Sequence, residues 1–243
     1  MNLTDFEMSL FEPPNPVEGN CASTRERFQW NAMALSKGPV LNVGSCDDPM
    51  GFAHRAVHYD LDDWSEYYER KSLDTGLIHP FIQGDAHKVH LKFGVGLFDL
   101  VVMGDIIEHL YDPIRAVQSA AAVSKRLLAM TIWEEWRVPP GEGAGIQMLE
   151  DEAHEKGFGS YLDLYVDMQK GRGVVPVDNR IIPHHGHLYN FTDDQINALV
   201  GALIDMGMVK HAFVKVPETI HEGHVCMNWC VLLSWERELP CRL

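Results

Sequence analysis

The chain has little positive charge and no long apolar run. Lysine and arginine together number 20, against 35 aspartate and glutamate residues, which gives a formal net charge of -15. Most of such a surface repels a phosphate backbone, so we expect no nucleic-acid partner. No apolar stretch approaches the roughly 18 residues that span a bilayer, so we expect no membrane partner either.

Cysteine is also scarce and irregular. The five cysteines are odd in number and unevenly spaced, which does not predict a disulfide framework. No basic segment followed by an apolar core is recognised as a secretory signal, and the expected location is therefore cytoplasmic. Apolar residues make up 46% of the 243 residues, enough for a sizeable core.

Short apolar runs alternate with helical patterns through the first half of the chain. We expect strands at about 40–43, 56–60, 77–83, 98–103 and 126–132. Helices are expected at 23–36, from 62 or 63 to about 73, and from a capping Asp112 with Pro113 at its first position to 123. Strands that alternate with helices indicate a parallel sheet covered by helices.

The remaining segments depart from this rhythm. Residues 1–20 are rich in proline and are expected to form an irregular arm. A structureless loop as long as 134–190 is rare in a compact domain, so we interpret that segment as a lid or inserted subdomain. A capping box at 192–195 then begins a helix that a glycine ends, and two strands are expected at 209–216 and 229–235.

Two apolar runs stop at small or acidic residues, as a buried strand does where its carboxyl end opens into a ligand crevice. The runs are 40–43, followed by Gly44-Ser45-Cys46, and 98–103, followed by Gly104-Asp105. In open α/β sheets, ligands bind at these carboxyl ends.

The first of these ends does not carry a dinucleotide fingerprint. That motif would need glycine at positions 44, 46 and 49, where the chain has Gly44, Cys46 and Pro49. The missing glycines disfavour a nicotinamide-dependent dehydrogenase, and Asp47 and Asp48 would repel a pyrophosphate. The pattern favours a cofactor without phosphate, such as an adenosine that carries a sulfonium and an amino-acid tail.

Carboxylates follow the next two expected strands. Asp60 ends the second strand, near the offset at which an acid binds ribose hydroxyls, and Asp62 competes with it for that role. Asp85 stands where a carboxylate can accept from an adenine amino group while the Ala86 amide donates to a ring nitrogen. Ordinary capping and turn positions explain the same acids, and that alternative stays open.

Three sequence blocks now carry a resemblance to a known family. They are Leu41-Asn42-Val43-Gly44, Gly84-Asp85-Ala86, and the stretch from Phe98-Asp99 through Glu108-His109-Leu110 to Asp112-Pro113. The Asp60 acid and the later segment Gly186-His187-Leu188-Tyr189-Asn190-Phe191-Thr192 extend the resemblance. These blocks are similar to those of class I S-adenosylmethionine-dependent methyltransferases, in the small-molecule branch. The resemblance implies an α/β, Rossmann-like, seven-stranded and mostly parallel sheet with its last strand antiparallel, helices on both faces, and a lid inserted after strand 5.

The resemblance also implies a division of the chain and a cofactor, S-adenosylmethionine. The parts are an N-terminal arm and helix (1–37), a cofactor-binding half (38–133), a lid or substrate insertion (134–190), and a C-terminal helix and strand pair that complete the sheet (191–243). The implied cofactor residues are Gly44, Ser45 and Cys46 under the methionine and ribose, Asp60 or Asp62 at the ribose, Asp85 and Ala86 at the adenine, and Met103 and Gly104 facing the sulfonium.

The implied activity is methyl transfer to an oxygen or nitrogen of a small-molecule acceptor by in-line displacement. The protein then mainly aligns the acceptor and excludes water. A base is needed only where the acceptor loses a proton, and the candidates are His109, His185 and His187. Helix capping for His109, and lid packing or capping for His185 and His187, are the alternative explanations.

Two departures from the family pattern keep a second hypothesis open. Asn42 stands where the family usually has an acid, and Cys46 stands where it usually has a glycine, whose absence narrows the approach to the cofactor. A catalytically inactive protein that binds S-adenosylmethionine on the same fold is therefore the alternative.

Three further features are less specific: two groups of possible metal ligands, two arginines near the N-terminus and an apolar helix. A tetrahedral zinc site needs two tight ligand pairs, so we expect no zinc at His221, His224, Cys226 and Cys230. We likewise expect no divalent ion at His184, His185 and His187. Arg25 and Arg27 either bind the carboxylate of the cofactor's tail or carry ordinary surface charge. An apolar helix near 150–170 either packs on the core, lines an acceptor pocket or forms a homodimer face.

Overall fold

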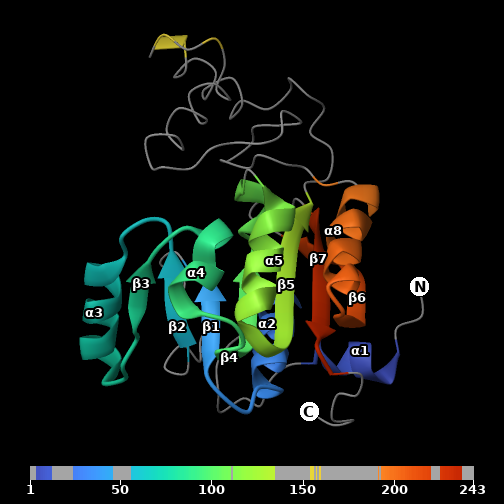
Figure 1. Cartoon of the computed structure of the whole chain (residues 1–243), viewed down its shortest axis with the longest axis horizontal. Coiled ribbons are helices and arrows are strands. Elements are labelled where there is room, and N and C mark those ends of the chain that lie inside the picture. Colours follow the sequence, from blue (N-terminus) through green and yellow to red (C-terminus); the bar gives the residue numbers. More distant parts are fainter. Residues whose placement is uncertain are drawn as a thin grey trace.

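A single sheet of seven strands forms the centre of the molecule, in the order β3-β2-β1-β4-β5-β7-β6 (Figure 1). The computed structural model describes residues 4–12, 24–45, 56–110, 112–134, 154–155, 157, 159, 191, 193–219 and 225–236. The strands are β1 (Val40–Val43), β2 (Ala56–Asp60), β3 (Phe81–Gln83), β4 (Phe98–Gly104), β5 (Ser124–Glu134), β6 (Val209–Thr219) and β7 (Val225–Ser234). Strands β1 to β5 pair in parallel, whereas β7 is antiparallel to both β5 and β6. The expected seven-stranded, mostly parallel sheet is confirmed.

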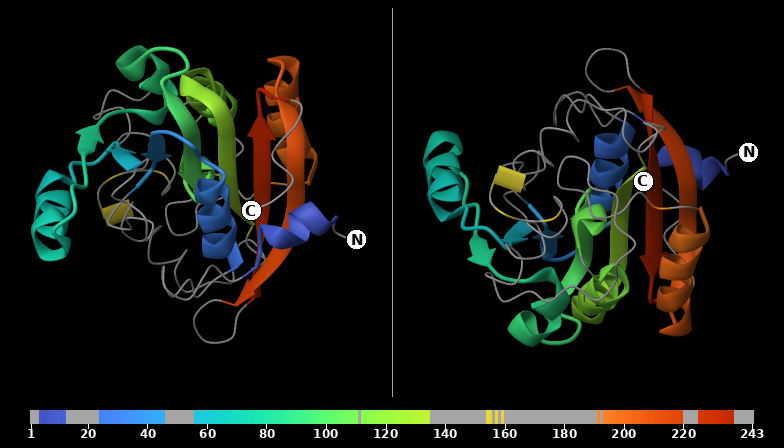
Figure 2. Two further views of the ribbon diagram at one scale, coloured as in Figure 1. Left: turned by 90° about the horizontal axis from the view of Figure 1, so that it is seen from below. Right: turned by 90° about the horizontal axis from the view of Figure 1, so that it is seen from above.

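Helices cover both faces of this sheet (Figure 2). One face carries α1 (Asp5–Ser9), α2 (Thr24–Ala34) and α3 (Ser65–Thr75), and the other carries α4 (Val89–Phe93), α5 (Pro113–Val123) and α8 (Asp193–Asp205). Two short 3₁₀ turns, η2 (Ala86–Lys88) and η3 (Ile107–His109), follow β3 and β4. No helix within the described ranges combines the length and apolar content of a membrane span.

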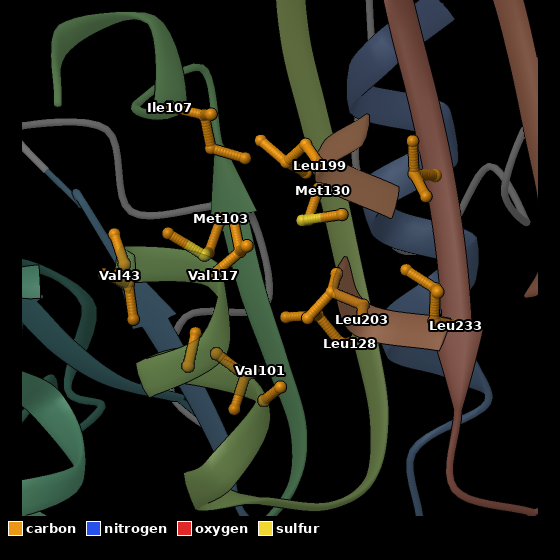
Figure 3. Packing of buried hydrophobic residues seen from close by; sticks show 14 of the residues in the cluster. Val43, Val101, Met103, Ile107, Val117, Leu128, Met130, Leu199, Leu203 and Leu233 are labelled. Atoms are coloured by element: carbon orange, nitrogen blue, oxygen red, sulfur yellow. The ribbon is translucent and has the colours of Figure 1, made fainter. Parts of the chain in front are cut away.

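Strand β4 shows why both faces are covered. Its side chains alternate, so that Leu100 and Val102 join the core beneath α2 while Val101 and Met103 join the core beneath α5 and α8. Figure 3 shows Met103 against Val117 of α5. Because both alternating sets are apolar, the strand reads as one continuous apolar run, as a strand buried on both faces does.

The helix predicted after Asp112 begins as expected. The Asp112 side chain accepts a hydrogen bond from the Arg115 amide at 3.1 Å, and Pro113 occupies the first turn, where its missing amide hydrogen costs nothing. The strand expected at 77–83 is shorter than predicted. Only Phe81–Gln83 pair with β2, because the chain before them reaches β2 through a single bond from the His58 amide to the Pro80 carbonyl.

The structure describes part of the expected N-terminal arm and very little of the expected lid. The irregular arm expected over 1–20 contains a helical turn, because Thr4 and Glu7 form a capping box that starts α1. That expectation was wrong for residues 5–9. The expected lid over 134–190 lies almost wholly outside the described residues, as does Thr192 of the second capping box.

The amino ends of β4 and β5 are joined by a buried ion pair. The Arg126 guanidinium donates two hydrogen bonds, each 3.1 Å long, to the two carboxylate oxygens of Asp99. Asp99 Oδ2 also accepts from the Ser36 hydroxyl and the Lys37 amide, and Arg126 donates to the Leu35 carbonyl. The pair therefore fixes the chain between α2 and β1 to two strands of the sheet.

Breaking this pair on one side should cost much of the molecule's stability. The two side chains are only 8% and 12% exposed, so Arg126→Leu leaves a buried carboxylate without its partner and should lower the free energy of unfolding by about 3–5 kcal/mol. Arg126→Lys should recover only part of this loss, because an ammonium cannot make the two-pronged contact. Urea unfolding monitored by circular dichroism measures both. Asp193→Asn, at an exposed ion pair with Lys215, is the matched control and should change little. An equally small effect of Arg126→Leu would contradict the assignment.

Candidate functional site

At the end of β1, the backbone of Gly44 packs directly against Ile106 and Tyr59. Gly44 has φ +76°, and its amide donates to the Tyr59 carbonyl at 2.7 Å. A Cβ at this position would lie 2.6 Å from Ile106 Cβ, so a side chain here is excluded by both backbone and space. Ser45 follows, buried, and its hydroxyl has no hydrogen-bond partner among the described residues. Cys46, the next predicted residue, lies outside the described residues.

The end of β2 separates the two carboxylates that the sequence left in competition. Asp60 is 8% exposed, whereas Asp62 is exposed. The Asp62 amide donates to Asp60 Oδ1 at 3.0 Å and so helps to orient that carboxylate. Asp60 is therefore the buried carboxylate of the two, and Asp62 contacts it through its backbone amide.

Asp85 follows β3 and is ionised. Its Oδ1 accepts from the His87 amide at 2.9 Å and from His87 Nδ1 at 2.6 Å, and Lys88 Nζ lies 3.3 Å from Oδ2. Burial by itself would raise the pKa of Asp85, but the hydrogen bonds and the electrostatic interaction with His87, together with the contact from Lys88, outweigh it and lower the pKa to about 2. The adjacent Ala86 is buried at the start of η2.

Tyr59 contacts the backbone of Gly84 and Asp85. Its hydroxyl donates to the Asp85 carbonyl at 3.2 Å, and its ring occupies the space that a side chain at Gly84 would need. Burial, together with the nearby Asp85 charge, raises the pKa of Tyr59 to about 12, so the phenol keeps its proton. Glycine at 84 is therefore required by the packing of Tyr59.

At the end of β4, Met103 and Gly104 lie against packed side chains, and their position facing the sulfonium stays a prediction. The Met103 side chain is fully buried in the core, and Gly104 lies against Gln29, whose amide donates to Thr131 Oγ1 at 2.8 Å. The first polar side chain at this end belongs to Asp105, which has φ +48°. An aspartate in the left-handed region is uncommon, and such backbone strain is often found at functional sites.

Asp105 forms an ion pair with Arg25 of α2. Helix α2 runs opposite to the strands, so its first turn reaches their carboxyl ends (Figure 1). Asp105 Oδ1 is buried and has no hydrogen-bond partner among the described residues. Sequence reasoning did not select Asp105, although an acid directly after a strand is the same signal that identified Asp60.

Glu108 is a second residue that the sequence reasoning overlooked as a titratable group. It is fully buried in η3, its Oε1 accepts from the Trp133 amide at 3.4 Å, and its Oε2 has no hydrogen-bond partner in the described part of the chain. Burial raises the pKa of Glu108 to about 8 despite the opposing charge of Arg25. The carboxyl is therefore mostly protonated at neutral pH.

Of the three candidate bases, the structure describes only His109. His109 lies in η3, partly exposed, beside the end of β4. His185 and His187 lie outside the described residues, as do His184, His221 and His224. In the described ranges no group of three or more histidine, cysteine or acidic side chains is arranged to hold a metal ion, and Cys230 is buried within β7.

The sheet order brings the strand-end groups together. Strands β3, β2, β1 and β4 are consecutive neighbours, and neighbouring strands lie about 4.8 Å apart. The groups that follow them, Asp85, Asp60, Gly44-Ser45 and Asp105, therefore line one edge of the sheet. Sequence reasoning identified three of these four positions.

The pKa of Glu108 makes a measurable prediction about stability. Because the folded-state pKa lies above the ordinary value of 4.5, the folded chain holds this proton more tightly than the unfolded chain does. The contribution to stability is fully present below about pH 4.5 and is lost as the pH rises through about 8. Glu108→Gln, a neutral isostere, should become more stable relative to the wild type by on the order of 4 kcal/mol between pH 5 and pH 9.

Urea unfolding at pH 5, 7 and 9 measures this difference. The exposed Glu66→Gln is the control for removing one carboxylate, and its stability should stay parallel to that of the wild type. Parallel pH curves for Glu108→Gln and the wild type would show that the Glu108 carboxyl is ionised in the folded protein.

Comparison with known proteins finds similarity in structure only. No protein-family model matches the chain, and no curated protein matches its sequence. A Rhodobacter sphaeroides protein described as a zinc-dependent alcohol dehydrogenase is 12% identical and has a TM-score of 0.52, with 91% of this chain and 90% of that chain covered. A structure described as the conversion of a disulfide bond into a thioacetal group during echinomycin biosynthesis is 14% identical, with a TM-score of 0.50 and coverage of 86% and 81%.

A magnesium protoporphyrin IX methyltransferase from Synechocystis, with S-adenosylhomocysteine bound, is also similar. It is 11% identical, with a TM-score of 0.49 and coverage of 93% and 91%. At these identities the likenesses show the fold alone. The sheet itself, parallel through β5 and antiparallel at β7, is the one that the sequence resemblance implied. The chain therefore has the Rossmann-like, seven-stranded α/β fold that the sequence resemblance implied.

Proposed function

We propose that the chain is an enzyme that transfers a methyl group from S-adenosylmethionine to an oxygen or nitrogen atom of a small-molecule acceptor. The observation that carries this proposal is the ordered set of groups at the carboxyl edge of four neighbouring strands. Gly44 offers bare backbone, Asp60 offers an acceptor for a ribose diol, and Asp85 offers an acceptor for an adenine amine.

The residues at this edge fit such a cofactor. A buried polar atom without a partner is costly unless something satisfies it, and the Ser45 hydroxyl and Asp105 Oδ1 are two such atoms in the described structure. A polar ligand seated beside Gly44 would supply their partners. The left-handed Gly44 also lets that ligand approach the backbone closely.

The charges match the amino-acid tail of the cofactor. Arg25 and Asp105 place one cation and one anion side by side at the end of β4. The tail carries one carboxylate and one ammonium, so each of its charges has a counterpart of opposite sign here. The planar guanidinium suits the carboxylate, and Asp105 suits the ammonium or the sulfonium.

When bound, the cofactor supplies an electrophilic methyl group. The chain's own residues then align the acceptor with it and exclude water. Where the acceptor must lose a proton, we propose His109, His185 or His187 as the base. Glu108 is poorly suited to that role at neutral pH because its carboxyl still holds its proton.

The likeness to a protein described as an alcohol dehydrogenase raises a second candidate function. The dinucleotide-binding arrangement of parallel strands has its phosphate site at a glycine-rich turn after the first strand. This chain has only Gly44 of the three glycines required, and its sheet ends with the antiparallel β7. These features favour the methyl donor over a nicotinamide cofactor.

Calorimetric titration with S-adenosylmethionine and S-adenosylhomocysteine tests the proposal. Both should bind the wild-type protein. Asp60→Asn should weaken binding about tenfold or more, because a hydrogen bond to a charged group contributes about 1.5–3 kcal/mol. Asp74→Asn, which removes an exposed carboxylate on α3, should leave binding unchanged.

The outcomes separate the hypotheses. Absence of binding to either compound would refute the proposal, and binding of a nicotinamide dinucleotide instead would favour the dehydrogenase. Binding without formation of S-adenosylhomocysteine on any small acceptor would favour an inactive binding protein on the same fold. One of the two departures that motivate this alternative has a structural explanation. Asn42 is buried within β1, where its side chain contacts His58 Nδ1 at 3.4 Å.

A further inference from the structure

A buried histidine stands behind the carboxylate that follows β3. His87 lies in η2 with 2% of its side chain exposed. Its ring nitrogen Nδ1 lies 2.6 Å from Asp85 Oδ1, and its backbone amide donates to the same oxygen at 2.9 Å. The short distance and the burial show a close side-chain contact that is largely shielded from solvent.

The other ring nitrogen determines where the proton lies. The Asp112 amide donates to His87 Nε2 at 3.4 Å, and a nitrogen can accept only when it carries no hydrogen. The hydrogen of the neutral ring is therefore on Nδ1, and Nδ1 donates to Asp85. Since Asp112 caps α5, the histidine joins Asp85 to the first turn of that helix.

This arrangement leaves the two oxygens of Asp85 in different states. Oδ1 is occupied by two donors from His87. Oδ2 is buried, has no hydrogen-bond partner in the described structure, and meets only the ammonium of the half-exposed Lys88 at 3.3 Å as an ion pair. Oδ2 is therefore the oxygen with acceptor capacity left for a ligand.

We propose that His87 is a positioning residue that holds Asp85 with Oδ2 toward the ligand, and that the site thereby selects a purine with an amine at position 6 over one with an oxo group there. This inference rests on the proposed function, since it takes the ligand to be an adenosine compound. A carboxylate accepts from an amine but opposes an oxo group, because two acceptors then face each other without a hydrogen. Selectivity depends on Oδ2 being held in place, which is the task of His87.

The test compares two ligands, S-adenosylhomocysteine and its 6-oxo analogue, in which hypoxanthine replaces adenine. The wild-type protein should bind the amine about tenfold or more tightly than the oxo compound. His87→Asn keeps a donor at the place of Nδ1 and should keep most of this ratio. His87→Gln keeps an acceptor for the Asp112 amide but removes the donor to Asp85, and its ratio should fall to within about threefold of unity. Thermal unfolding of both variants separates this effect from a general loss of stability.

A second variant tests the same orientation without changing the histidine. In Asp85→Asn the amide oxygen should take the place of Oδ1, because only an acceptor can face the two donors of His87. The NH₂ group must then occupy the place of Oδ2 and point to the ligand. The preference should therefore reverse, so that the 6-oxo analogue binds more tightly than S-adenosylhomocysteine. This result keeps the proposal testable even where the His87 variants do not fold.

Each outcome bears on one proposal or the other. If the wild type binds neither ligand, the proposed function itself fails. If the wild type binds both but the ratio is the same in His87→Gln, or if Asp85→Asn keeps the preference for the amine, the role given to His87 is wrong while the cofactor assignment stands. Retention of the ratio in His87→Asn together with its loss in His87→Gln supports the positioning role.

Discussion

Parallel pairing of β1 through β5 is the constraint on which the rest of the structure depends. A parallel strand can follow another only after the chain has crossed back over a face of the sheet, so all five of these strands end at the same edge. This geometry brings Gly44, Asp60, Asp85 and Asp105 into one row although they are far apart in the sequence. It also explains why α2, which runs back against the strands, presents Arg25 to that row.

Buried carboxyl groups are paired differently at the amino ends and at the carboxyl ends of the strands. At the amino edge, both oxygens of Asp99 are paired with Arg126, so the contact serves stability. At the carboxyl edge, Asp105 and Glu108 each keep a buried oxygen without a hydrogen bond among the described residues. Burial of polar groups without partners lowers stability, and it is retained where a ligand can supply the partners. The hydrogen bonding of these buried oxygens therefore distinguishes the amino ends of the strands, where the contacts stabilise the fold, from the carboxyl ends, where the candidate site lies.

Much of the fold and part of the site could be predicted from the sequence. Strand β4 and helix α5 were predictable because an apolar run and an Asp-Pro start are local signals. Helix α1 was overlooked although its capping box is also local, because the prolines nearby drew the interpretation toward an irregular arm. Asp105 and Glu108 could not be ranked from the sequence, since their strain, burial and pairing with Arg25 depend on contacts across elements.

The sequence by itself determined the alternation of strands and helices, the order of the strand-end acids and the absence of a dinucleotide fingerprint, because periodicity and composition are properties of short segments. Only the tertiary structure decided that Asp60 and not Asp62 is turned inward, and that His87 lies between Asp85 and the start of α5. Burial and hydrogen-bond direction arise from segments that meet in space, and no pattern within one segment records them.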